Sequence, residues 1–133
     1  MSPNRNRLGL FTCLLALGLL SACAHFIPTT DEARVYHVVL CWLKEPGNPE
    51  ARQQIIDVSK GFKSIPGVIA VKAGASIPSD RTIVDDSFDV GILLTFADQQ
   101  AMNTYLNHPD HKQIVQNVLK PLVTKIIVYD FIE

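Results

Sequence analysis

Strands that are apolar on both faces constrain this fold more than any other feature of the chain. Residues 36–43 place Tyr36, Val38, Leu40 and Trp42 on one face and His37, Val39, Cys41 and Leu43 on the other. Residues 88–96 show the same double-sided apolarity apart from Asp89. A strand with one face in water normally alternates apolar and polar residues. Both segments are therefore predicted to be covered on both faces.

The residues after the first strand predict a helix. Asn48 is a suitable N-cap, and Pro49 occupies the first helical position. One apolar stripe at 4-3-4-3 spacing then consists of Ala51, Ile55, Val58, Phe62 and Ile65. Pro66 and Gly67 end this helix, and residues 68–75 are predicted to form a second strand.

The remaining elements follow a long polar loop over residues 76–87 and the third strand, residues 88–96. Asp98 is predicted to cap a short helix that ends at His108 and Pro109, because a residue before proline disfavours helical geometry. Pro109 starts another helix that Pro121 interrupts, and residues 125–131 form the last strand. This order predicts an α+β fold, the ferredoxin-like split βαβ sandwich.

The apolar strands also predict an oligomer. Helices cover only one face of a four-stranded sheet of this kind, so the other face would expose a large apolar patch to water. The patch comprises Tyr36, Leu40, Trp42 and Leu93. A two-fold homodimer that packs sheet against sheet would bury it. The predicted assembly is therefore a dimer.

The N-terminal segment predicts the cellular location. Arg5 and Arg7 precede an apolar run of about 13 residues, 8–20, which suits a signal peptide and is short of the ~20 residues that span a bilayer. The sequence Leu-Ser-Ala-Cys at 20–23 resembles the lipobox of bacterial lipoproteins. The resemblance implies a signal peptide over residues 1–22, acyl chains such as palmitate on Cys23, and a lipidated tether over 23–34.

Two alternatives to the lipobox remain open, an ordinary secretory signal and an uncleaved anchor. The lipoprotein interpretation predicts a lipid-anchored protein of the bacterial envelope, on the periplasmic face of the outer membrane, with Ala24 compatible with outer-membrane sorting. Loss of Arg5 and Arg7 leaves 10 basic against 13 acidic residues, since the full chain has 12 and 13. This mildly acidic balance gives no basic surface for nucleic acid.

Five segments of the folded part resemble the stress-responsive α/β-barrel (Dabb) domain family. They are the residues YHVVL at 36–40, IPGV at 65–68, FDVG at 88–91, YLNHPDH at 105–111 and VYDF at 128–131. The similarity spans residues 35–133, and its most specific part is 105–111. It implies a ferredoxin-like protomer and a dimeric barrel. Because members differ in function, the resemblance does not define an activity.

The resemblance also implies a candidate site. In polyketide cyclases of the family, a histidine and a tyrosine at the positions of His111 and Tyr105 act as base and hydrogen-bonding partner. They lie in a pocket between the helices and the sheet. The residues expected to line this pocket are His37, Val39, Cys41, Ile92 and His108. Imidazole and phenol in one pocket suit proton transfer next to a carbonyl group.

A structural role for the same residues is the competing hypothesis. His111 and Tyr105 would then form hydrogen bonds at a helix junction, and His108 would help to cap the third helix. A metal site built from three histidines is disfavoured because Pro109 breaks helical spacing, so no metal is predicted. No cofactor is predicted either, since no glycine-rich phosphate loop is present. The single thiol of the folded part, Cys41, is expected to be a small buried apolar group.

Two functions therefore remain open. The first is a non-catalytic, membrane-tethered dimer that binds a small apolar molecule or a partner, under envelope stress. The second is a cofactor-free, polyketide-cyclase-like enzyme that uses His111 and Tyr105. A cavity that reaches His37, Tyr105 and His111 together would favour a ligand-handling role.

Overall fold

The computed structural model describes residues 33–133. The predicted signal peptide, Cys23 and the tether up to residue 32 lie outside the described residues. The strands are β1 (Val35–Leu43), β2 (Val68–Ala75), β3 (Val90–Phe96) and β4 (Val123–Ile132). The helical segments are α1 (Pro49–Gly61), η1 (Phe62–Ser64), α2 (Gln99–Asn107), α3 (Pro109–Ile114), η2 (Val115–Leu119) and α4 (Lys120–Leu122).

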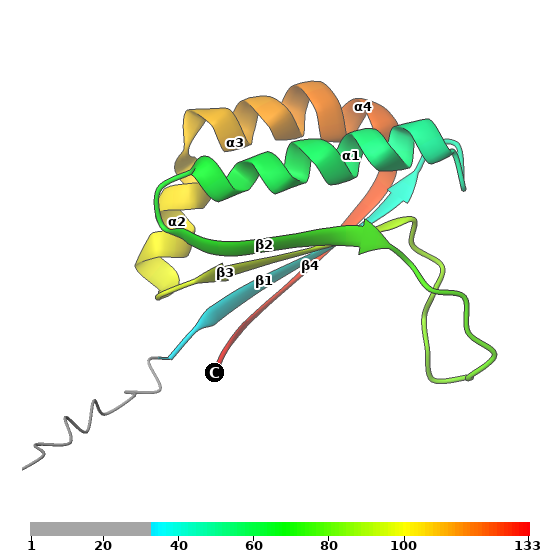
Figure 1. Ribbon diagram of the computed structural model, residues 1–133, viewed down its shortest axis with the longest axis horizontal. Coiled ribbons are helices and arrows are strands. Elements are labelled where there is room, and N and C mark those ends of the chain that lie inside the picture. Colours follow the sequence, from blue (N-terminus) through cyan, green and yellow to red (C-terminus); the bar gives the residue numbers. More distant parts are fainter. Residues whose placement is uncertain (1–32) are drawn as a thin grey trace, which may run out of the picture. The chain divides into compact units, whose positions relative to one another are not determined.

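The four strands form one antiparallel sheet in the order β2-β3-β1-β4. The helices pack on one face of this sheet, and the loop between β2 and β3 projects from the opposite side (Figure 1). This arrangement confirms the predicted ferredoxin-like α+β fold. It also makes β2 and β4 the edge strands, a point that matters for access to the site.

The helix starts follow the predicted capping chemistry. The Asn48 side chain accepts hydrogen bonds from the backbone N–H groups of Glu50 and Ala51. Asp98 caps α2 through the N–H of Ala101. Gly67 adopts φ +90°, and a Cβ there would lie 3.2 Å from the Ala101 carbonyl oxygen, so the turn before β2 requires glycine.

The structure corrects two boundaries. Asp89 does not extend β3, because its carboxylate leaves the strand and accepts hydrogen bonds from the backbone N–H groups of Leu43 and Gly47, at 2.9 and 2.8 Å. Pro121 does not interrupt its helix outright. The five residues of η2 before it form a π-helical turn, and the helix ends at Leu122. Proline cannot donate a backbone hydrogen bond and crowds the preceding turn, which accounts for the widened helix.

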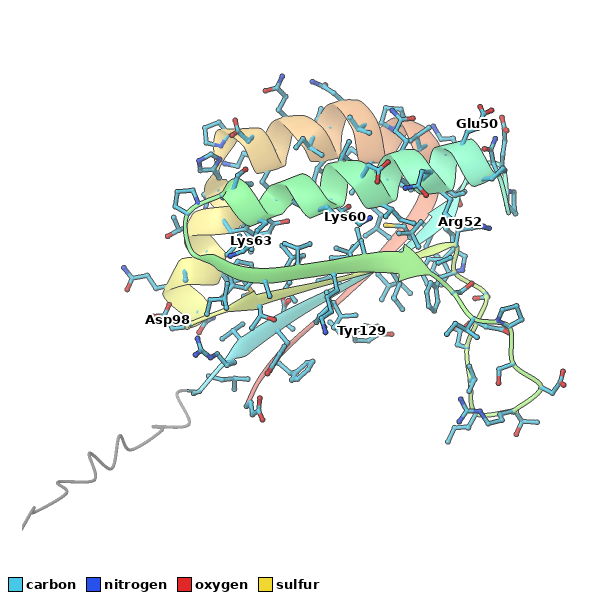
Figure 2. All side chains as sticks on the ribbon, viewed as in Figure 1. Glu50, Arg52, Lys60, Lys63, Asp98 and Tyr129 are labelled. Carbon is cyan, nitrogen blue, oxygen red and sulfur yellow. The ribbon has the colours of Figure 1, made fainter. Side chains whose placement is uncertain are left out.

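The two faces of the sheet differ in burial. Residues of β1 that point towards the helices are buried, whereas Tyr36, Leu40 and Trp42 on the other face are only partly covered. Tyr129 lies on this outer face and is 57% exposed (Figure 2). Lys125 sits 4.1 Å above the Trp42 ring as a cation–π contact. The outer face is thus the open apolar surface that the double-sided strands predicted.

Candidate functional site

A cavity of about 190 Å3 lies between the helical layer and the inner face of the sheet. Its lining combines apolar side chains with two imidazoles and one phenol: His37, Val39, Phe62, Ile92, Leu94, Tyr105, Leu106, His111, Val115, Leu119, Ile126 and Val128. The most exposed of these residues is Val128, at 45%, on the edge strand β4. The cavity therefore opens at this edge. Three predicted site residues, His37, Tyr105 and His111, meet inside it.

His37 enters the cavity from β1. Its cross-strand partner in the sheet register is Asp130 of β4. The Nδ1 atom of His37 lies 2.6 Å from a carboxylate oxygen of Asp130, and the side chains are 7% and 44% exposed, respectively. An ionised carboxylate has no proton to donate and acts only as an acceptor. The Nδ1 atom of His37 therefore donates this hydrogen bond. Asp130 consequently holds the orientation of the imidazole.

Tyr105 lies at the centre of the aromatic cluster and is 2% exposed. Its ring centroid is 4.4 Å from His111, 5.2 Å from Phe96 and 5.6 Å from Phe62. Within residues 33–133, no group forms a hydrogen bond with the Tyr105 hydroxyl, and Tyr105 lines the cavity. Burial raises the pKa of this phenol, so it stays protonated. The hydroxyl is a polar group that is free to meet a ligand.

His111 reaches the cavity from the first turns of α3. Its Nδ1 atom lies 3.2 Å from the carbonyl oxygen of Leu106, and because a carbonyl only accepts, Nδ1 donates. Burial lowers the pKa of His111, against the opposing effect of the Leu106 carbonyl. The ring is therefore held as a neutral imidazole with Nε2 as its lone-pair nitrogen.

The other predicted lining residues divide into two groups. Val39 and Ile92 form part of the wall. Cys41 is fully buried in the core and does not line the cavity, and burial raises the pKa of its thiol to about 11. His108 is also outside the lining, because its Nδ1 accepts a hydrogen bond from the Asp110 backbone N–H at 3.3 Å and so caps α3.

Sequence reasoning missed Asp130 and Phe62 as parts of the site. Asp130 carries the only charge in the segment 126–132 of β4, which is otherwise apolar or aromatic. If the first and last strands are paired antiparallel, this lone carboxylate can lie opposite the buried histidine of the first strand. That pairing was the signal that could have identified Asp130. Phe62 was assigned to the core stripe of the first helix. Its ring also contacts Tyr105 edge to face and His111 at a tilt, and it forms part of the cavity wall.

Residues 33–133 lack two features, a metal-binding cluster and a membrane-spanning helix. No group of three or more histidine, cysteine, aspartate or glutamate side chains is arranged to hold a metal ion in this part of the chain. Within the same range, no helix has the length and apolarity needed to cross a membrane.

Comparison with known proteins identifies relatives of this domain. The family model described as "Stress responsive A/B Barrel Domain" matches residues 35–133. The curated proteins contain no significant match to this sequence. A solved Dabb family protein with a ferredoxin-like fold from Mesorhizobium loti is 26% identical, with a TM-score of 0.61, and the match covers 74% of this chain and 95% of that one.

Two further solved structures share the fold. A dimeric ferredoxin-like protein of unknown function from Thermobifida fusca is 18% identical, with a TM-score of 0.60 and coverage of 76% and 92%. The hydroxynitrile lyase from Passiflora edulis is 21% identical, with a TM-score of 0.63 and coverage of 75% and 93%. The matching region makes up more than nine-tenths of each of these solved chains, so in those proteins the fold occurs without a further domain.

Proposed function

Because this chain belongs to the stress-responsive A/B barrel family, we propose that it is a dimeric binding module for a small apolar molecule, anchored by lipid in the bacterial envelope. The cavity is the observation that carries the proposal. It is apolar apart from His37, Tyr105 and His111, which converge from three different elements. Natural ligand sites combine an apolar wall with a few convergent polar groups in the same way.

The size of the cavity limits the ligand. An apolar protein cavity of about 150 Å3 accommodates benzene. A volume of about 190 Å3 therefore suits one ring with a short substituent. The unpartnered Tyr105 hydroxyl and the two imidazoles would fix the orientation of such a molecule, while Phe62 and Ile92 would contact its ring.

The proposed dimer buries the outer face of the sheet. Solved relatives from Thermobifida fusca, Bacteroides fragilis and Jannaschia are described as dimeric. The open patch with Tyr36, Leu40, Trp42 and Leu93 supports the same assembly here, since each of these residues is only partly covered in the single chain. Packing of two such faces would close the barrel that the family name describes.

The proposed location rests on the sequence at 20–23. Acylation of Cys23 would hold the dimer at the membrane through two tethers, and two or more acyl chains bind a bilayer firmly. We place the module on the periplasmic face of the outer membrane. The family is described as stress responsive, and at this location the stress would be envelope stress. Lipid provides the membrane contact, because the mildly acidic mature chain does not.

Blocking the cavity tests the binding function. Val128→Trp would place an indole at the mouth without disturbing the deep core, since Val128 is already 45% exposed. Ile132→Trp is the matched control, because Ile132 lies on the same strand and face but outside the lining. In amide chemical-shift titrations of residues 33–133 with toluene, we expect saturable binding in the wild type and the control. Loss of binding is expected only in Val128→Trp, and an absence of toluene binding in the wild type would contradict the proposal.

A second candidate function is cofactor-free proton transfer on a one-ring carbonyl compound. The observation that favours it is the contact of His111 with Tyr105, at 4.4 Å between ring centroids, in a cavity that also holds His37. The similarity to a hydroxynitrile lyase gives this cyclase-like alternative a chemical precedent on the same fold. His111 would act as the base and Tyr105 would stabilise the oxyanion. Deuterium exchange at the methyl group of acetophenone tests it. Exchange that His111→Ala abolishes would support catalysis, and exchange no faster than in buffer would contradict it.

A further inference from the structure

We propose that the cavity selects ligands that donate a hydrogen bond, with a one-ring hydroxyl compound such as phenol as the simplest member of the class. The inference rests on the proposed binding function and names its ligand chemistry. It follows from the way in which the protein uses one nitrogen of each cavity histidine and leaves the other one free.

The first step concerns His37. Its Nδ1 proton is committed to Asp130 at 2.6 Å. When the ring carries this single proton, Nε2 has none and acts as an acceptor only. Within the described part of the chain, Nε2 forms no hydrogen bond, and it is not sealed off as a buried atom without a partner. This nitrogen is therefore available to a ligand in the cavity that His37 lines.

The second step repeats the pattern at His111. Its Nδ1 proton is committed to the Leu106 carbonyl at 3.2 Å, so Nε2 is again an acceptor without a partner among residues 33–133. Burial keeps this ring neutral by lowering its pKa. The two imidazoles thus line one small cavity from opposite layers, His37 from the sheet and His111 from the helices.

The remaining lining excludes other ligand classes. Among residues 33–133, no lysine or arginine lines the cavity, and the Asp130 carboxylate behind His37 adds negative charge close to it. A carboxylate ligand would enter without a cationic partner and would lose its hydration. A ligand that only accepts hydrogen bonds could use the Tyr105 hydroxyl alone. A hydroxyl ligand can donate to an imidazole Nε2 and also accept from Tyr105, so it satisfies the most groups.

Imidazole nitrogen spectra test the premise. In 15N spectra of residues 33–133 at pH 8, both His37 and His111 should show a protonated Nδ1 and an unprotonated Nε2. Free histidine favours the opposite tautomer, so the pattern is diagnostic of the Asp130 and Leu106 hydrogen bonds. A protonated Nε2 on either ring, whether from the other tautomer or from imidazolium, would overturn the proposal.

A ligand series at the same pH tests the consequence. Phenol, toluene and benzoate have similar ring sizes but are respectively a donor, an apolar compound and an anion. We expect phenol to bind at least ~10-fold more tightly than toluene, as about one to two net hydrogen bonds provide, and benzoate not to bind. Toluene binding equal to phenol binding would overturn the inference but leave the binding function intact. Absence of binding by all three would contradict the binding function itself.

Asp130→Ala tests the positioning role of the carboxylate. Removing it frees the Nδ1 of His37, so we expect phenol to lose ~3- to 10-fold in affinity, while toluene affinity stays unchanged and reports an intact cavity. Asp57→Ala on the exposed face of α1 is the matched control and should change neither affinity. Unchanged phenol binding in Asp130→Ala, or a mere parallel loss of both ligands, would contradict the role of Asp130.

Discussion

Replacement of Tyr105 by phenylalanine separates structural and functional contributions of the site. The ring is 2% exposed and contacts Phe62, Phe96 and His111, and phenylalanine preserves these contacts. Only the hydroxyl is lost, and no described residue pairs with it. Because a polar group without a partner opposes burial, the free energy of unfolding should stay within about 0.5 kcal/mol or rise by up to about 1 kcal/mol.

Binding should respond in the opposite direction. Loss of the hydroxyl should weaken phenol binding by about 0.5–1.5 kcal/mol, or ~2- to 12-fold. Tyr105→Ala is the contrast, since removal of a buried aromatic ring should cost about 3–5 kcal/mol of stability. Urea unfolding and calorimetric titration of residues 33–133 measure both quantities. If Tyr105→Phe destabilised the domain by more than about 1.5 kcal/mol, the hydroxyl would have a structural partner and the reasoning would fail.

Three further predictions concern other parts of the chain. Trp42→Asp should convert the dimer into monomers in sedimentation experiments, because it places a charge in the apolar interface on the outer face of the sheet. Lys60→Asp on the exposed helical face should leave the dimer intact. Equal dimer content in the two variants would refute the interface. The lowered pKa of His111 means that the folded state resists protonation, so unfolding free energy should fall as pH drops below about 6.5. His111→Gln should weaken that dependence, and an unchanged pH profile would contradict it. Cys23→Ser should block acylation and signal cleavage while Cys13→Ser leaves both intact, and mature-size lipoprotein in the Cys23 variant would exclude the lipobox.

The fold was predictable because its signals are local and consistent. The caps at Asn48 and Asp98, the prolines at helix starts and the apolar periodicity each specify one element. The order of those elements then leaves few topologies. The ends of the strands were harder to predict than their existence, and Asp89 shows why. A carboxylate next to an apolar strand is compatible with the strand until tertiary contacts give it two backbone N–H partners in a distant turn.

The site was predictable only in part. His37, Tyr105 and His111 were named from the family resemblance, and the structure places them in one cavity. The partner of His37 depends on the register between β1 and β4, which pairs it with a residue 93 positions away, and no local pattern encodes that register. His108 lies only three residues before His111, yet its extended backbone (φ −64°, ψ 137°) makes it the N-cap of α3 rather than a residue of the helix.

Native mass spectrometry of the protein released from its own membrane tests the central claim most directly. The account predicts two chains, each carrying acyl groups on Cys23, with a small uncharged molecule retained in each cavity or taken up when phenol is added. Val128→Trp should give the same lipidated dimer without the small molecule. A monomer, or a dimer that takes up phenol equally well in the wild type and in Val128→Trp, would contradict the account.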